Sequence, residues 1–447
     1  MAHRDDPRNS AGAREVERSE TRMSGVLSLW LLSLCTSKEK VTRRKGETGR
    51  KDDGENNYVH NSFILLSSKR FELGGVDMSS NEEWQPVIRE VHLFGGARAI
   101  NYMEPLVNIV PDTVSGKTAR FRLSGFGSLF KELRDLNMGI VGCDFFTHSI
   151  EVEGISPPQW RTKCLVNPSW LCTDQGHEWS FIAHSAFKQK NGIFFDMASR
   201  ISHQLRACEW RLRQLSESYR DQLGSTLKSK SFDEGRRFSN GYTSLCYLAF
   251  QSFLVEVCIL RDYLSEFYWV SNFEKAVGDK KITTLGGLLK EWRKNPPSDK
   301  LGKEIKASAC LGGWLFELGA YRDLVVHSAP LAQADRALFA VCHSSAMPQG
   351  ERLPGIKLPI PNNPFEISGG RSSGRYFSDP ELNFARFSNA LEDVDSVKDA
   401  LQYAHLSMQL ISALSKSVSD ISPVRPEVPM LTAKDILGGV KVTREGL

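Results

Sequence analysis

The fold is decided by a long apolar stretch in the middle of the chain, Leu245-Cys-Tyr-Leu-Ala-Phe-Gln-Ser-Phe-Leu-Val-Glu-Val-Cys-Ile-Leu-Arg-Asp-Tyr-Leu264. Wound as a helix, this sequence is apolar almost all round, and such a helix is normally buried inside a bundle. The charged residues Glu256, Arg261 and Asp262 interrupt it, which argues against a membrane span. We therefore predict a buried helix over about 242–273 and no contact with a membrane.

Amphipathic helices flank the buried one. Apolar residues recur at steps of three and four, as on one face of a helix, in the ranges 195–223, 285–294, 301–327 and 390–415. Gly224 is expected to end the first of these helices. We predict a mainly α fold, in which a helical bundle covers 195–417 and a loop rich in Gly, Pro, Asn and Ser covers 344–389.

The two ends of the chain differ in composition from the bundle. Residues 1–77 are dominated by Arg, Asp, Glu, Gly and Ser, and such a composition cannot bury enough apolar surface to offset chain entropy. We expect a disordered N-terminus, which is an extension if translation starts at Met23 or Met78. The Pro-rich residues 418–447 predict an extended tail.

Residues 78–190 have a mixed pattern. Positions 130–136 look helical, whereas β-branched and aromatic residues at 139–146 and 150–153 indicate strands. We predict a smaller α+β region of unknown role over 78–190.

Composition limits the function classes only loosely. The 447 residues include 57 basic and 53 acidic side chains, for a net charge of +4, so any nucleic-acid site must be a local patch. The nine cysteines are scattered singly, which favours a reducing compartment and predicts a cytoplasmic protein.

One predicted helix ends in a motif that could carry chemistry, Arg322-Asp323-Leu-Val-Val-His327. Asp323 and His327 are four residues apart, so they share a helix face, where the carboxylate can orient the imidazole and raise its pKa. Arg322 and His327 would be about 140° apart on an ideal helix. A permanent cation suits phosphate binding and a histidine suits proton transfer, although a simple charge pair at a helix end explains the same residues.

The motif resembles the signature of the HEPN superfamily, in which His follows Arg after four to six residues and a polar residue often stands directly after Arg. The segment 321–328 matches that form, and the helices before it match the context. The resemblance implies a HEPN-like bundle over 195–417 that cleaves RNA without metal or cofactor. It also implies a homodimer in which Arg322 holds the phosphate, His327 transfers protons at the ribose 2′-hydroxyl, and Asp323 completes the site.

Such proteins are commonly toxins or antiviral defence effectors, so an antitoxin or another protein is an expected partner. Many members of the superfamily are not catalytic, and the alternative function is a non-catalytic helical protein-interaction module. A second pair of similar spacing, Arg336 and His343, lacks the polar residue after arginine, and we interpret it as accidental.

Other charged residues have two interpretations each. Glu256 and Arg261 lie in the buried helix, where they either support the motif as a second shell or form structural ion pairs. A basic stretch that includes Arg206, Arg211 and Arg213 is either an RNA-binding groove or a solvated helix face.

A zinc site is the third functional reading. Two Cys-x4-His units share one spacing and a further cysteine lies between them; the five residues are Cys143, His148, Cys164, Cys172 and His177. Structural zinc usually takes four ligands that include a closely spaced cysteine pair. Because that pair is absent, we predict no metal, and a zinc-stabilised regulator is the least favoured alternative.

Overall fold

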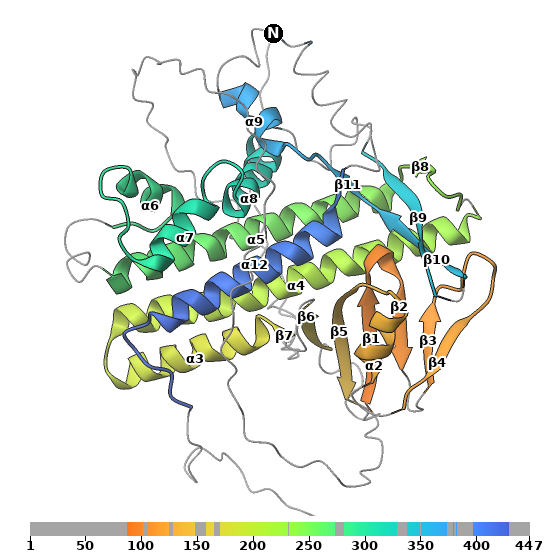
Figure 1. The fold of residues 1–447 in the computed structure, drawn as a ribbon, viewed down its shortest axis with the longest axis horizontal. Coiled ribbons are helices and arrows are strands. Elements are labelled where there is room, and N and C mark those ends of the chain that lie inside the picture. The colour runs from red at the N-terminus through yellow and green to blue at the C-terminus, as the bar shows by residue number, and fades with distance from the viewer. Residues whose placement is uncertain are drawn as a thin grey trace, which may run out of the picture. The chain divides into compact units, whose positions relative to one another are not determined.

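The structure, a computed structural model, is an α+β fold in which a seven-stranded antiparallel sheet precedes long helices (Figure 1). It describes residues 87–101, 106–124, 128–147, 158–164, 170–230, 232–272, 281–328, 338–348, 350–372, 379, 381 and 397–428. Residues 80–447 belong to one compact unit, and the described part lies within it. The prediction of a mainly α chain is therefore confirmed for the helical part, whereas the sheet is larger than the small α+β region that the sequence predicts.

The sheet has the strand order β4-β3-β2-β1-β5-β6-β7. Its strands are β1 Val87–Leu93, β2 Arg98–Asn101, β3 Leu106–Val110, β4 Ala119–Arg122, β5 Ile140–Thr147, β6 Gln159–Lys163 and β7 Trp170–Leu171. The predicted strand at 139–146 is confirmed as β5, and the predicted helix at 130–136 is confirmed as α2 (Leu129–Asp135). The predicted strand at 150–153 and the predicted disorder of 1–77 concern residues outside those that the structure describes.

The two faces of β1 meet different partners. Val91 and Leu93 are buried in an apolar cluster that includes Leu129 and Leu133 of α2. His92, on the opposite face because side chains alternate along a strand, contacts Ser216 of the long helix α4. One face of the sheet therefore packs against α2 through apolar side chains, whereas the other face contacts α4 through polar side chains.

Long helices make up most of the rest of the described chain. They are α3 Thr173–Lys188, α4 Gly192–Lys228, α5 Gly241–Asn272, α6 Leu285–Trp292, α7 Lys300–Ser308, α8 Trp314–Asp323, α9 Pro364–Ser372 and α12 Ala400–Asp420. The helix predicted over 242–273 is confirmed as α5, but it is buried on one side only, since Leu245 and Leu248 are exposed. The prediction that Gly224 ends the preceding helix is wrong, because α4 continues to Lys228 and buries Thr226 beyond that glycine.

The single helix predicted over 301–327 is two helices, α7 and α8. Gly312 between them has a positive φ of 85°, a conformation that glycine adopts without steric cost. A Cβ atom on Gly313 would lie 2.1 Å from the Ser308 carbonyl oxygen, so the turn also requires the second glycine. After Asp323 the chain continues as a π-helical turn, Leu324–Ser328.

The prediction of a loop over 344–389 is wrong for most of its described part. Strand β9 (Ala340–Ala346) pairs with β10 (Arg352–Lys357) and with β8 (Arg237–Phe238), and β11 (Pro359–Ile360) pairs with β12 (Lys398–Asp399). Three of the residues that suggest a loop, Pro354, Gly355 and Pro359, lie within these ladders. Gly355 of β10, for example, packs directly against the backbone of Gly95.

The last long helix begins later than the sequence predicts. We expect a helix over 390–415, but α12 spans Ala400–Asp420, and the Asp399 side chain caps it by accepting a hydrogen bond from the Gln402 backbone. Residues 421–428 form no helix or strand, and the rest of the predicted extended tail, 429–447, lies outside the described residues. The Glu427 backbone is fixed by the hydroxyl of Ser185.

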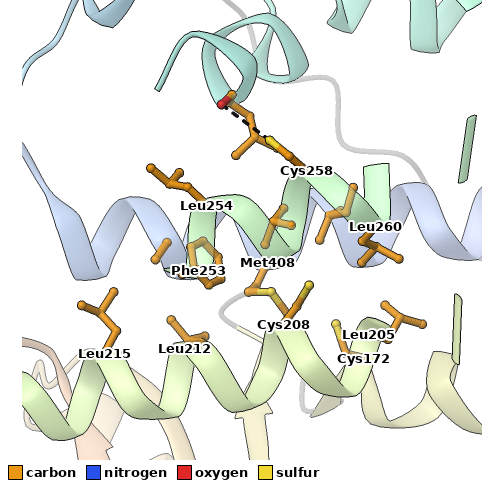
Figure 2. Close-up of a cluster of buried hydrophobic side chains, with 14 of the residues drawn as sticks. Cys172, Leu205, Cys208, Leu212, Leu215, Phe253, Leu254, Cys258, Leu260 and Met408 are labelled. Carbon is orange, nitrogen blue, oxygen red and sulfur yellow. Dashed lines mark hydrogen bonds between the residues drawn. The ribbon is translucent and has the colours of Figure 1, made fainter. Parts of the chain in front are cut away.

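The main core lies where α4, α5 and α12 meet. Figure 2 shows Leu212 and Cys208 of α4 facing Phe253 of α5, with Met408 of α12 between them. By length and composition α5 could also cross a membrane, and half of its most apolar window is buried within the protein. That is weak evidence in either direction, so a cytoplasmic location and the absence of a membrane stay predictions.

Candidate functional site

The motif predicted from the sequence lies at the C-terminal end of α8. Arg322 and Asp323 are 40% and 54% exposed, and Arg322 Nη1 donates to Asp323 Oδ1 over 2.8 Å. Leu324 and Val325, which follow, are buried. The backbone of His327 belongs to the π-helical turn, whereas its side chain lies outside what the structure describes. The two described polar groups of the motif therefore face solvent rather than the bundle.

The π-helical turn changes the geometry expected for Arg322 and His327. Its hydrogen bonds join residues five apart instead of four, so each residue advances less around the axis than in an α-helix. The angle between positions 322 and 327 is therefore smaller than the about 140° of an uninterrupted α-helix. Single π turns inside or at the end of α-helices occur frequently at functional sites.

Buried residues anchor the motif from beneath. The hydroxyl of Tyr321 donates to the Pro361 carbonyl oxygen over 2.5 Å, and the Tyr321 ring lies 4.6 Å from the ring of Tyr403 between centroids. Burial raises the pKa of the Tyr321 hydroxyl well above its usual value, so it stays a donor. The end of α8 is thus fixed by aromatic packing and one buried hydrogen bond.

Of the two predicted supporting residues, Arg261 lies beside the motif helix. Its guanidinium donates to Asp262 over 3.2 and 3.1 Å, and a Cβ atom on Gly319 of α8 would lie 3.2 Å from Arg261 Nη1. Burial raises the pKa of the Cys258 thiol to about 11, and the charges of Arg261 and Arg322 both act on that thiol. Two arginines therefore lie near one buried cysteine, Cys258.

Glu256, the other predicted supporting residue, does not reach the motif through any described contact. Its carboxylate accepts from Gln204 over 2.7 Å and from Arg211 over 3.4 Å, both on α4. Glu256 therefore forms an ion pair with Arg211 between two packed helices, as the structural interpretation predicts.

The three arginines predicted to bind RNA lie in three different settings. Arg206 is exposed and donates to Ser180 of α3. Arg211 bonds with Glu256 and Gln214, and Arg213 points toward the sheet, where it donates to Asp144. Because Arg211 and Arg213 are paired with carboxylates of α5 and of the sheet, the three arginines do not form one basic face.

A buried polar cluster that the sequence did not reveal lies between the sheet and α4. We call it the sheet–α4 network, and it consists of His92, Asp144, Arg213, Ser216 and Glu217. His92 Nδ1 lies 3.1 Å from Ser216 Oγ, and His92 Nε2 lies 3.2 Å from Asp144 Oδ2. Burial, followed by the charge of Arg98, lowers the pKa of His92 to about 3. The neutral ring therefore donates from Nε2 to the carboxylate and accepts from the serine hydroxyl at Nδ1.

Asp144 is the charged centre of the network. Burial alone would raise the pKa of its carboxyl group, but the hydrogen bonds from His92 and Arg213 outweigh burial and lower the pKa. Ser216, His92 and Asp144 form a hydrogen-bonded chain of the types that nucleophilic enzymes use. They are 0%, 0% and 1% exposed, so no substrate reaches them and the chain is structural.

The same network contains a described group of side chains with metal-ligand geometry, His92, Asp144 and Glu217, whose ligand atoms lie within 4.8 Å of one another. Arg213 Nη2 lies 2.8 Å from Asp144 Oδ2 and 3.3 Å from Glu217 Oε1. The guanidinium thus already supplies the positive charge that a metal ion would bring, and we assign no metal there.

The cysteines considered for zinc are not brought together. Cys143 is buried in β5, Cys172 is buried before α3, and His177 is exposed on α3. Among the described residues, none of these side chains or Cys164 belongs to a group with metal-ligand distances, and His148 lies outside the described part.

Comparison with known proteins identifies no relative: no family model, no curated protein and no solved structure matches the chain. The candidate functional site is accordingly the surface at the end of α8, where Arg322 and Asp323 lie.

Proposed function

We propose that the protein is a HEPN-like ribonuclease whose site is built around Arg322, Asp323 and His327. The observation that carries the proposal is the placement of Arg322 and Asp323 at the surface, directly before the π-helical turn that holds residue 327. The side chain of Arg322 is 40% exposed, so a phosphate group can reach its guanidinium beside Asp323.

Each group has a role that follows from its chemistry. Arg322 presents a permanent planar cation that binds two phosphate oxygens at once. His327 takes the proton of the ribose 2′-hydroxyl or returns one to the leaving oxygen, steps that a positioned histidine accelerates about 10²–10⁴-fold. Asp323 holds Arg322 in place through the 2.8 Å hydrogen bond. No step in this scheme uses a metal or a cofactor, and two protomers would combine their motifs.

The test is cleavage of single-stranded RNA in the presence of a metal chelator. We expect His327→Ala and Arg322→Ala each to lower the rate about a hundredfold or more, with no effect of the chelator. His343→Ala is the matched control, because His343 is 59% exposed and belongs to the second Arg–His pair of similar spacing. Equal cleavage by the wild type and all three variants would end the ribonuclease proposal.

A second function, a non-catalytic protein-interaction module, is favoured by an apolar stripe on α5. Tyr242, Leu245, Leu248 and Val255 are all exposed and are separated by three, three and seven residues, so they lie along one side of the helix. Exposed apolar residues that gather along one side of a helix are typical of interaction sites. The partner we propose is a second copy of the chain.

Sedimentation of the wild type against Leu245→Glu tests this second function. We expect the wild type to self-associate and Leu245→Glu to do so less. Leu311→Glu, at an exposed position outside the stripe, is expected to behave as the wild type. Self-association without RNA cleavage would favour the interaction module over the ribonuclease, and a wild type that stays monomeric would contradict both.

A further inference from the structure

A groove of about 510 Å³ runs along the hairpin of α3 and α4. We call it the α3–α4 groove. Its volume lies in the range of ligand sites, about 300–1,000 Å³. The groove shares no residue with the α8 motif.

One end of the groove is aromatic. Phe187 of α3 and Phe195 of α4 are 67% and 41% exposed, and their ring centroids are 5.6 Å apart at an interplanar angle of 53°. Because both side chains are this exposed, a ligand can contact the two rings. Aromatic faces of this kind stack on nucleic-acid bases of any sequence.

The rest of the groove offers hydrogen-bond donors and positive charge. His184 and His203 line its middle, and Arg206 lines the far end, where its Nη2 donates to Ser180 Oγ over 3.4 Å. None of the described residues that line the groove carries a carboxylate. The nearby Asp196 is paired with Arg200 over 2.9 Å. An anionic ligand in the groove would therefore contact hydrogen-bond donors and no carboxylate of the lining residues.

The length of the groove decides which anionic aromatic ligand fits. Phe195 and Arg206 are eleven residues apart on one α-helix, which at 1.5 Å per residue is about 16 Å. Stacked nucleotides rise about 3.4 Å each. A mononucleotide therefore cannot reach both ends of the groove, whereas a strand of several nucleotides can.

We propose that the α3–α4 groove binds single-stranded nucleic acid, with bases stacked on Phe187 and Phe195 and phosphates bound by Arg206 and His203. Of the three arginines predicted to bind RNA, this assigns the role to Arg206. The proposal is independent of the ribonuclease proposal, because no residue of the α8 motif takes part.

The test is binding of a fluorescent 2′-O-methylated RNA of about eight nucleotides, which cannot be cleaved by attack of a 2′-hydroxyl. The result therefore does not depend on whether the protein cuts RNA. We expect Phe187→Ala to weaken binding about tenfold, the loss expected when one base no longer stacks on an aromatic ring. Phe187→Tyr should retain the affinity. Arg206→Ala should weaken binding and lower the slope of log affinity against log salt by about one.

Matched controls are Phe365→Ala and Arg236→Ala, which remove an exposed phenylalanine and an exposed arginine outside the groove. We expect both to bind as the wild type. Binding that is unchanged in Phe187→Ala and Arg206→Ala would overturn the proposal. So would equal affinity for uridine monophosphate, or for duplex RNA of the same length, because neither ligand uses the stacking surface along the whole groove.

Discussion

The sheet–α4 network and the Arg322–Asp323 pair are both built from arginine and aspartate, yet their surroundings differ. In the network Asp144 is 1% exposed and bonds to Arg213 and His92, whereas at the end of α8 both partners are about half exposed. Removing one partner of a buried pair leaves an uncompensated charge inside the protein. An exposed pair is screened by water and contributes little to stability. The same two residue types thus hold the fold together in one place and lie at the surface of the protein in the other.

The largest loss of stability is expected from a substitution of Asp144. We expect Asp144→Ala to lower the free energy of unfolding by about 3–5 kcal/mol, because His92 and the largely buried Arg213 would both lose the buried carboxylate that they share. Chemical denaturation followed by circular dichroism measures the change, with Asp323→Ala as the exposed counterpart. A loss below about 1 kcal/mol for Asp144→Ala would mean that the network is not structural.

A second prediction concerns the pH dependence of stability, which tests Glu209 at the interface between the sheet and α4. Glu209 of α4 accepts from Thr162 and Thr173, and burial raises its pKa from 4.5 to about 8. The pKa of Glu209 is higher in the folded protein than in the unfolded chain. Between pH 4.5 and 8 the folded protein therefore keeps a proton on Glu209 that the unfolded chain releases. Its contribution to stability is complete below pH 4.5 and is lost as the pH rises toward 8.

Between pH 6.5 and 8 we therefore expect the wild type to lose about 1–2 kcal/mol of unfolding free energy, because the slope of about 1.36 kcal/mol per pH unit decreases as the pH approaches the folded pKa. Glu209→Gln, which cannot ionise, should lose little over the same interval. Denaturation at the two pH values compares the proteins, and equal losses would contradict a protonated Glu209. His92 acts in the opposite sense: its folded pKa of about 3 lies below 6.5, so its contribution is present above pH 6.5 and is lost as the pH falls.

A third prediction concerns the anchor beneath the exposed pair. Tyr321→Phe removes the buried hydrogen bond to the Pro361 carbonyl and is expected to cost about 1 kcal/mol of unfolding free energy. Tyr242→Phe changes an exposed tyrosine and should have no measurable effect. If the two variants were equally stable, the end of α8 would not be held by the Tyr321 hydroxyl.

The smallest expected effect is at the motif itself. Arg322→Ala should change the free energy of unfolding by less than about 1 kcal/mol, because an exposed ion pair contributes little. Thermal and chemical unfolding of this variant would be measured beside the RNA cleavage assay. A loss of several kcal/mol would show that Arg322 is structural, and any loss of cleavage would then reflect unfolding.

Local patterns predict some elements well. The bounds of α5 follow from the sequence within two residues, because its apolar content is continuous and does not depend on a partner. Helix α2 and strand β5 follow in the same way. The position of Arg322 and Asp323 at a helix end was also predictable, although the π-helical turn after them was not.

Elements that depend on distant partners were not predictable. Strand β10 and the end of β9 look like a loop by composition. They become strands because they pair with each other, and β9 also pairs with β8, about a hundred residues earlier. The sheet–α4 network needs β1, β5 and α4 at once, and Ser216 is 124 residues from His92. No local signal could have placed these groups together.

The sequence by itself determined the two longest helices, α4 and α5, because continuous or periodic apolar residues mark each of them along its whole length. It also marked the motif at 322–327, since a residue type and a spacing can be read without coordinates. Only the tertiary structure decided which charges are buried and which are exposed, because burial depends on neighbours that lie far away in the chain. That is why Arg213 is held in the sheet–α4 network while Arg206 on the same helix lines an open groove.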